Sequence, residues 1–309
     1  MSQTKPITKA AIVGCNWGMV HLAALQQSGL ELSALVDVDL PRAQSLAQQL
    51  NIAHACQSLT QVPEVDLVII ATPAISHMQV IEHFSQQAII CEKPLLGLSA
   101  NQLPANWPKR LWVNYAFNQL ESAQLINRLI QPTQGPVRVQ LSSQVNLPLK
   151  FNLEQWFLET ASHPLSWLLH LLGEPRQLSK QTNEQELKLE LACGEHRINI
   201  DFTLGGAAGI YHQVRVQQGS QQLQLQGHYI PGQAWRFMPV LLNDEPQNQG
   251  EYHESDCWLL ANQRSTSLII KHLQGQLSEA ELLAQGGFNP TKALWLEQSL
   301  LGEKFNSAS

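Results

Sequence analysis

The sequence is poor in charge and has no cluster of basic residues. Of its 309 residues only 14% are charged, and the formal net charge is −6. Proteins that follow a nucleic-acid backbone need clustered Lys and Arg, so we expect no nucleic-acid partner. No apolar run approaches the roughly 20 residues of a membrane-spanning helix. Because Met1–Lys9 is also polar, we expect no membrane partner and no targeting segment.

Disulfide and metal-ligand patterns are missing as well. The five cysteines are odd in number and far apart, at Cys15, Cys56, Cys91, Cys193 and Cys257. This spacing fits neither a disulfide framework nor a zinc site, and a reducing cytoplasm is the location we expect. The eleven histidines form no metal-type cluster, so the sequence predicts no metal site.

One stretch near the middle of the first half has the pattern of strand, turn, helix and strand. Val65–Ala71 and Ala88–Cys91 are nearly unbroken apolar runs, and Ser76–Gln86 between them has helical spacing. Continuous apolar runs are typical of parallel strands buried on both faces by helices. Ligands of such sheets bind beyond the carboxyl ends of the strands. The residues expected at that edge are Thr72, Pro73, Glu92 and Lys93.

The first strand and its turn have a degraded dinucleotide-binding pattern. An apolar strand, Ala10–Val13, leads into Gly14-Cys15-Asn16-Trp17-Gly18 and then a helix. A pyrophosphate binds at such a strand–glycine turn–helix junction, against backbone N–H groups. With Gly14 as the first glycine of G-x-G-x-x-G, Asn16 stands at the second position and Met19 at the third. Asn tolerates the left-handed conformation, so the turn can survive, but an ordinary βα turn remains the alternative.

An acidic residue follows the second strand. Leu32–Val36 ends at Asp37, 23 residues after Gly14. A carboxylate at this place accepts hydrogen bonds from the adenosine ribose and repels a 2′-phosphate, so it favours NAD over NADP. The alternative is a solvated loop aspartate. Leu111–Phe117 is expected to be the sixth strand of the sheet.

The motifs together resemble those of the glucose-fructose oxidoreductase, inositol dehydrogenase and MocA (Gfo/Idh/MocA) family. They are the glycine turn with His21, Thr72-Pro73 followed by His77, and Glu92-Lys93-Pro94. The resemblance implies an α/β fold. Its first part would be a dinucleotide-binding Rossmann domain at residues 1–118, with a doubly wound parallel sheet. Residues 119–309 would form a substrate-binding and oligomerisation α+β domain with an open, mostly antiparallel sheet, and we expect a homodimer or homotetramer.

The second half fits that plan through its periodicity. From Val137 to Leu147 apolar and polar residues alternate, and the pattern returns at Leu187–Leu191, Ile198–Leu204 and Val214–Leu225. Several such strands without intervening helices indicate an antiparallel sheet that needs a cover on one face. The expected cover is a helix at Pro164–Leu172, supported by helices at Trp258–Leu273 and Pro290–Leu301.

The covering helix also carries polar residues on one side. On a helical wheel His163, Ser166 and His170 lie opposite the leucines, and Glu159 joins them one turn earlier. Pro164 is tolerated only in a first turn, so we expect the helix to begin near Ser162. His163 would then lie at the positive end of the helix, which favours its neutral, proton-accepting form.

The resemblance gives these residues roles. The family carries D-x-x-x-H-x-x-D, which implies that His163 is the general acid/base, that Glu159 stands for the first acid and that Lys93 anchors the substrate. The family's last acid is Ser166 here, and its glycine two residues before the His is Ala161. The arginine often found after the sixth strand is replaced by Ala116-Phe117-Asn118. His77 is assigned equally to a contact on the cofactor side and to a helix cap.

The predicted function is that of an NAD(P)-dependent oxidoreductase. It would move a hydride between nicotinamide and a secondary alcohol or carbonyl of a small sugar, cyclitol or related polyol. NAD is the expected cofactor, with binding residues Gly14, Asn16, Trp17, Gly18, Asp37, Thr72, Pro73, His77 and Glu92. The alternatives are reduction of a C=N bond on the same fold and a non-catalytic sensor of cofactor or sugar. The resemblance further predicts a cis Lys93–Pro94 peptide.

Overall fold

A computed structural model describes residues 6–97, 106–148, 151–248, 250 and 256–301. The chain forms two compact units. Unit 1 comprises Met1–Tyr115 with Asn262–Ala293, and unit 2 comprises Ala116–Ala261 with Leu294–Ser309. This division differs from the expected one at 118/119, because a later segment of the chain belongs to unit 1.

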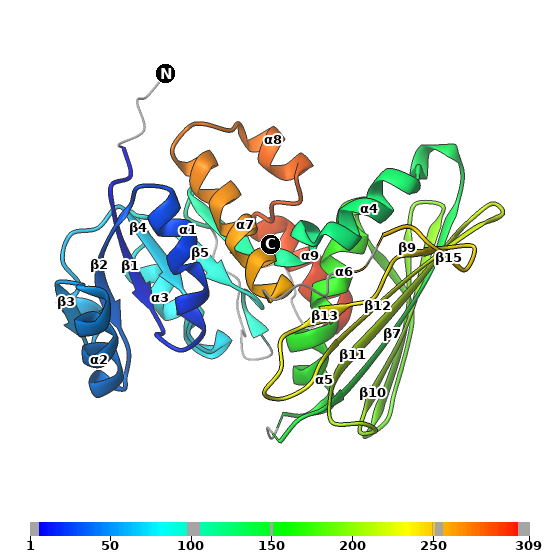
Figure 1. Cartoon of the computed structure of the whole chain (residues 1–309), viewed down its shortest axis with the longest axis horizontal. Helices are drawn as coiled ribbons and strands as arrows, with labels where there is room; N and C mark the ends of the chain where they lie inside the picture. The colour runs from blue at the N-terminus through cyan, green and yellow to red at the C-terminus, as the bar shows by residue number, and fades with distance from the viewer. Residues whose placement is uncertain (1–5, 98–105, 149–150, 249, 251–255, 302–309) are drawn as a thin grey trace. The chain divides into compact units, whose positions relative to one another are not determined.

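Unit 1 is built on a six-stranded parallel sheet in the order β3-β2-β1-β4-β5-β6 (Figure 1). Its strands are β1 (Lys9–Val13), β2 (Glu31–Val36), β3 (His54–Cys56), β4 (Leu67–Ile70), β5 (Ala88–Glu92) and β6 (Leu111–Asn114). The connecting helices are η1 (Trp17–His21), α1 (Leu22–Gln27), α2 (Leu40–Leu50), η2 (Leu59–Gln61), η3 (Ala74–Ser76) and α3 (His77–His83). The strand order reverses direction between β1 and β4, which is the topological switch point where ligands of doubly wound sheets bind. The predicted Rossmann sheet is therefore confirmed.

Both faces of this sheet are covered. Alternate residues such as Ile12, Ile69 and Ile90 belong to one core cluster and are fully buried. The residues between them, such as Ala11 and Val68, are equally buried. Burial on two faces explains why these strands read as continuous apolar runs.

The late segment of unit 1 closes one of the two faces. Helix α7 (Cys257–Leu273) contributes Ile269, Ile270 and Leu273 to the core cluster, and α8 (Glu279–Ala284) contributes Leu282. Phe288 then forms a backbone bridge to Val113 of β6. These contacts join residues more than 150 positions apart, which local periodicity cannot indicate.

Unit 2 contains an open sheet in the order β15-β14-β12-β11-β7-β10-β9-β8, with β13 paired to β12. Its strands are β7 (Val137–Asn146), β8 (Arg176–Thr182), β9 (Glu186–Cys193), β10 (His196–Leu204), β11 (Gly209–Gln218), β12 (Gln221–Tyr229), β13 (Arg236–Phe237), β14 (Leu241–Leu242) and β15 (Glu245–Pro246). All neighbouring strands are antiparallel except β7 and β10, which run parallel. The prediction of an open, mostly antiparallel sheet is confirmed.

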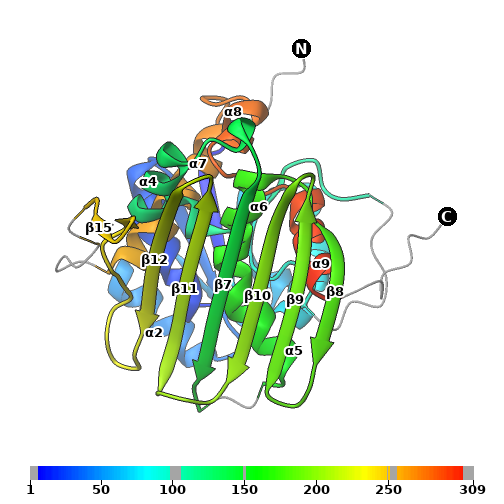
Figure 2. The same cartoon turned by 90° about the vertical axis from the view of Figure 1, so that its right-hand side faces the viewer.

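Helices cover one face of that sheet, as Figure 2 shows for α5 and α6 behind the strands β7 to β12. The helical elements of unit 2 are η5 (Ala116–Gln119), α4 (Glu121–Leu129), η6 (Pro132–Gln134), α5 (Leu153–Trp156), the π-helical turn η7 (Phe157–Ala161), α6 (Ser162–Leu172) and α9 (Pro290–Leu301), which begins in unit 1. Phe157 of η7 packs edge-on against Phe202 of β10, with ring centroids 5.3 Å apart. In the part of the chain that the structure describes, no helix is long and apolar enough to cross a membrane.

Candidate functional site

The turn after β1 is shaped by two glycines. Gly14 has φ +97°, and a Cβ atom added there would lie 2.5 Å from the carbonyl oxygen of Ala71. A side chain is therefore excluded both by backbone conformation and by the close approach of the β4 turn. A Cβ atom on Gly18 would lie 2.5 Å from Ile12 Cγ2, so this glycine permits close packing of η1 on β1.

Gly18, four residues after Gly14, provides the close helix packing of the motif's third glycine, so the turn is one residue shorter than G-x-G-x-x-G. One expectation about this turn is wrong. Asn16 has φ −79°, an ordinary right-handed value, and does not use the left-handed conformation.

Asp37 joins the end of β2 to the glycine turn. It is 8% exposed, and its Oδ2 accepts a hydrogen bond of 2.8 Å from the backbone N–H of Cys15. Its Oδ1 accepts one of 2.9 Å from the N–H of Asp39. Burial, followed by the charge of Asp37, raises the pKa of the Cys15 thiol to about 12, so this cysteine stays a thiol. The Arg42 guanidinium lies 3.9 Å from the Asp37 carboxylate, with Nη1 nearest.

Among the described residues of unit 1, three large apolar side chains are exposed, and each follows a strand of the switch-point region. Trp17 after β1 is 42% exposed, Val38 after β2 is 87% exposed and Ile75 after β4 is 76% exposed. These strands are neighbours in the sheet, so their carboxyl ends meet at one edge. Apolar side chains left in water at the ligand-binding edge offer a surface that a flat apolar group such as a base can cover. Val38 and Ile75 are absent from our sequence-based site, although Val38 directly follows Asp37 and Ile75 lies within the Thr72–His77 motif.

The turn after β4 is tied to the turn after β5 by His77. This residue is fully buried at the start of α3, with Nε2 2.8 Å from Thr72 O and Nδ1 3.0 Å from Pro94 O. Burial lowers the pKa of His77, although the carbonyl contacts and the Glu92 charge act in the opposite direction. The ring bridges two backbone turns and forms no helix cap, and its contact on the cofactor side stays a prediction. Pro73 is exposed and Thr72 half-buried, with the Thr72 hydroxyl accepting from Ser76 Oγ at 2.8 Å.

Glu92 is buried rather than open to a ligand. Its Oε1 accepts a hydrogen bond of 2.7 Å from Asn114 Nδ2 and lies 3.0 Å from His21 Nε2. Burial alone would raise the pKa of this carboxyl, but His21, Asn114 and the Lys93 charge together hold it below its usual value. The next residue, Lys93, is half-buried and is joined to Pro94 by a cis peptide, which confirms that prediction.

In unit 2, Glu159 and His163 lie in a helical stretch that is otherwise mainly buried. Both are partly exposed, four residues apart, on η7 and the first turn of α6. His163 contacts the Trp258 ring edge-on, with centroids 4.6 Å apart. A histidine and a carboxylate on one partly open side of a helix form a possible proton-transfer site.

The electrostatic argument for His163 needs correction. Helix α6 begins at Ser162 as predicted, but the π-helical turn η7 and α5 continue directly before it. His163 therefore does not lie at a free, positive helix end. The wider π turn precedes Pro164, which has no N–H to donate, and such turns are frequent at functional sites. Ser166, in the place of the family's second acid, is buried and donates a 2.6 Å hydrogen bond to His163 O.

The inner face of the unit 2 sheet holds another buried histidine. His212 of β11 has Nδ1 2.8 Å from Ser143 Oγ and stacks on the Trp235 ring at a centroid distance of 5.7 Å. Burial lowers its pKa from 6.5 to about 3, so the ring is neutral at physiological pH. Sequence reasoning gave no role to this residue.

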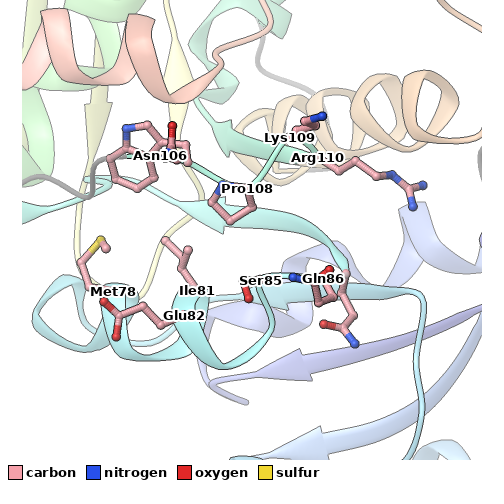
Figure 3. A pocket seen from close by; sticks show the side chains of 11 residues that line it. Met78, Ile81, Glu82, Ser85, Gln86, Asn106, Pro108, Lys109 and Arg110 are labelled. Carbon is pink, nitrogen blue, oxygen red and sulfur yellow. The ribbon is translucent and has the colours of Figure 1, made fainter.

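A pocket of about 550 Å³ in unit 1 lies away from the predicted site (Figure 3). It is lined by α3, through Met78, Ile81 and Glu82, and by Asn106–Arg110 before β6. Ser85, Gln86 and Gln87, which precede β5, complete it. These residues mark the amino ends of β5 and β6, whereas Gly14, Asp37 and Lys93 mark the carboxyl ends. The pocket and the predicted site therefore lie at opposite ends of the strands.

The doubly wound sheet, the glycine turn and the acidic residue after β2 together define the class of dinucleotide-binding Rossmann proteins. Residues 8–104 match the model of the "Oxidoreductase family, NAD-binding Rossmann fold" (GFO_IDH_MocA). This match to the first unit agrees with the resemblance of the motifs to the Gfo/Idh/MocA family.

Individual relatives agree in fold but are distant in sequence. Inositol 2-dehydrogenase 1 of Paenarthrobacter aurescens (strain TC1) is 34% identical over 99 residues, which span 30% of this chain and 29% of that protein. A myo-inositol dehydrogenase from Lactobacillus casei, solved with NAD(H) and myo-inositol, superposes with a TM-score of 0.67 at 16% identity, covering 95% of this chain and 92% of that one. An oxidoreductase from Agrobacterium radiobacter, solved with NAD+, L-tartaric acid and magnesium, gives a TM-score of 0.69 at 17% identity, covering 96% and 94%.

Proposed function

We propose that this protein is an NAD(H)-dependent oxidoreductase that acts on a CH–OH group or the matching carbonyl of a small polyol, sugar or cyclitol. The observation that carries the proposal is the composition of one edge of the unit 1 sheet. A glycine that cannot bear a side chain, a buried aspartate and exposed apolar residues follow the adjacent strands β1, β2 and β4. A dinucleotide needs each of these features, for its pyrophosphate, ribose and base respectively.

The preference for NAD rests on Asp37. Two backbone N–H groups already hold this carboxylate in place, so it can orient ribose hydroxyls without moving. Two like charges about 6 Å apart repel by about 3 kcal/mol at an effective dielectric constant of about 20, which would disfavour a 2′-phosphate by about 100-fold. Arg42 offsets part of this repulsion, so we expect a preference of about 10- to 100-fold.

The catalytic roles follow from residue chemistry. When bound, the nicotinamide supplies or accepts the hydride. Lys93 would hold the reacting oxygen by a charge-assisted hydrogen bond, and His163 would exchange that oxygen's proton, with Glu159 one turn before it on the same helix. The reaction requires Lys93 and His163 to approach one substrate oxygen from two sides. A homodimer or homotetramer is part of the proposal.

One observation favours the sensor as a second candidate. Ser166 donates its hydrogen bond to the backbone, so it cannot replace the carboxylate that the family carries there. A protein that binds NAD(H) and a polyol without turnover would need no such acid.

Calorimetry with NAD+ and NADP+ on the purified protein tests the cofactor assignment. We expect tighter binding of NAD+, and Asp37→Ser should remove most of the difference. Asp39→Ser is the matched control, because Asp39 is 46% exposed and caps α2 through the N–H of Arg42. Tighter binding of NADP+ would overturn the role of Asp37, and binding of neither would overturn the oxidoreductase. An assay of NAD+ reduction with cyclitols and sugars then separates the enzyme from the sensor.

A further inference from the structure

Five buried polar side chains form a connected network inside unit 1. They are His21, Glu92, Asn114, Asn262 and Thr266, and each is at most 5% exposed. They come from η1, β5, β6 and α7, four elements far apart in sequence. Polar groups so deeply buried are costly unless they contact one another, so this arrangement has a defined geometry.

His21 is at the centre of the network. Its Nδ1 lies 2.7 Å from Thr266 Oγ1, and its Nε2 lies 3.0 Å from Glu92 Oε1. The same Glu92 oxygen accepts from Asn114 Nδ2 at 2.7 Å, and that amide also lies 2.8 Å from Asn262 Oδ1. Because a carboxylate can only accept, the form of His21 that suits this contact carries a proton on Nε2. The orientation of the ring is thereby fixed.

The pair His21 and Glu92 connects the two parts of the proposed active site. His21 is the last residue of η1, the turn of helix that starts at Trp17 within the nucleotide-binding turn. Glu92 is the last residue of β5 and directly precedes Lys93. A shift of η1 by a fraction of an ångström therefore changes the 3.0 Å contact that holds the residue next to Lys93. Packed, buried contacts transmit such shifts because they have no room to absorb them.

We propose that His21 and Glu92 are positioning residues that couple dinucleotide binding at the Gly14–Gly18 turn to the placement of the Lys93 side chain. This inference rests on the proposed function, and it adds a device that prepares the substrate anchor only when the nucleotide is bound. Neither residue touches substrate, so both act through Lys93.

The test measures the reactivity of Lys93 and needs no substrate. The protein is reductively methylated with and without saturating ADP-ribose, and the methylation rate of Lys93 is read by peptide mass spectrometry. ADP-ribose fills the turn but lacks nicotinamide, so it cannot shield Lys93 by direct contact with that ring. In the wild-type protein we expect ADP-ribose to change the methylation rate of Lys93 by about fivefold or more, which is the lower end of the usual range of coupling between two sites. Lys188 on the exposed side of β9 is the internal reference.

Two substitutions of His21 separate coupling from packing. The amide nitrogen of His21→Gln takes the place of Nε2 and can still donate to Glu92, whereas His21→Asn reaches only toward Thr266. We expect His21→Gln to keep part of the ADP-ribose effect on Lys93 and His21→Asn to abolish it. A purely structural role would change both variants alike, since each loses one ring contact, and thermal unfolding checks that their stabilities match. If these variants do not fold, Glu92→Gln, which keeps the contact with Asn114, should reduce the effect.

The outcomes are distinct. An unchanged Lys93 rate in the wild-type protein, or an equal change in all variants, overturns the coupling. Calorimetry on the same samples reports ADP-ribose and NAD+ binding separately. Wild-type protein that binds neither would instead overturn the proposed function, and the coupling with it.

Discussion

Substitution of Gly14 by alanine should damage both the fold of unit 1 and its affinity for NAD+. The new Cβ atom would lie 2.5 Å from Ala71 O, 2.6 Å from Ala71 C and 2.9 Å from Thr72 N, all of them backbone atoms. The backbone must move to make room, and overpacking of this kind costs about 1–3 kcal/mol. An alanine held at the positive φ of +97° costs about 1–2 kcal/mol more. Alanine also makes the unfolded chain stiffer, which offsets about 0.4–1 kcal/mol of this loss of stability. We therefore expect a loss of about 2–4 kcal/mol in the free energy of unfolding.

Gly29→Ala is the matched control. Gly29 also has positive φ, +68°, but an added Cβ atom meets nothing within 4 Å. This variant should lose only about 1 kcal/mol, from conformation alone, and bind NAD+ normally. Urea unfolding and calorimetry with NAD+ give both quantities for both variants. For Gly14→Ala we expect at least about tenfold weaker NAD+ binding, because the displaced turn should lose about 1.4 kcal/mol or more of binding free energy, and each 1.4 kcal/mol is a factor of ten in affinity. If the two variants have the same stability and the same NAD+ affinity, the close approach of the β1 and β4 turns contributes to neither property.

Three further predictions concern single side chains. Replacing Ile75, 76% exposed, by Asp should weaken NAD+ binding by about tenfold without lowering the melting temperature, and unchanged calorimetry would remove Ile75 from the site. His163→Ala should lower turnover by about 10²–10⁴-fold with unchanged NAD+ affinity, whereas His170→Ala on the same helix should not; equal rates would refute the acid/base assignment. Because the pKa of His212 falls from 6.5 to about 3 on folding, its stabilising contribution is complete above pH 6.5 and is lost as pH falls toward 3. In His212→Asn the free energy of unfolding, measured with urea at several pH values, should decline by roughly 4 kcal/mol less between pH 6.5 and 3, and an unchanged decline contradicts the assignment.

The sheet of unit 1 was predictable because its cause is local. Strands covered on both faces must be apolar at every position, and Val65–Ala71 or Ala88–Cys91 carry that requirement in adjacent residues. Apolar and polar residues alternate along β7 because only one face of its sheet is covered, and this pattern is local in the same way. The fold class is confirmed for this reason. The cis Lys93–Pro94 bond, which is also confirmed, was predicted from the family resemblance and not from local periodicity.

The site was less predictable because its decisive contacts are long-range. Gly18 is needed because it meets Ile12, and a motif template gives this role to Met19 instead. The burial of Glu92 depends on His21, Asn114 and α7, and no local pattern joins them. The roles of Lys93, His163 and Glu159 stay predictions that the experiments above test.

The discontinuity of unit 1 has a consequence for synthesis of the protein on the ribosome. When residue 115 has just been made, all six strands of the parallel sheet exist, but α7 and α8 do not. The sheet face that later packs against Ile269, Ile270 and Leu273 then stays open while about 150 further residues are translated. At about 5–20 residues per second, this interval lasts on the order of 10 seconds. The nascent Rossmann sheet thus exposes an apolar face of the kind that chaperones bind, and it can be completed only after α7 and α8 have been made.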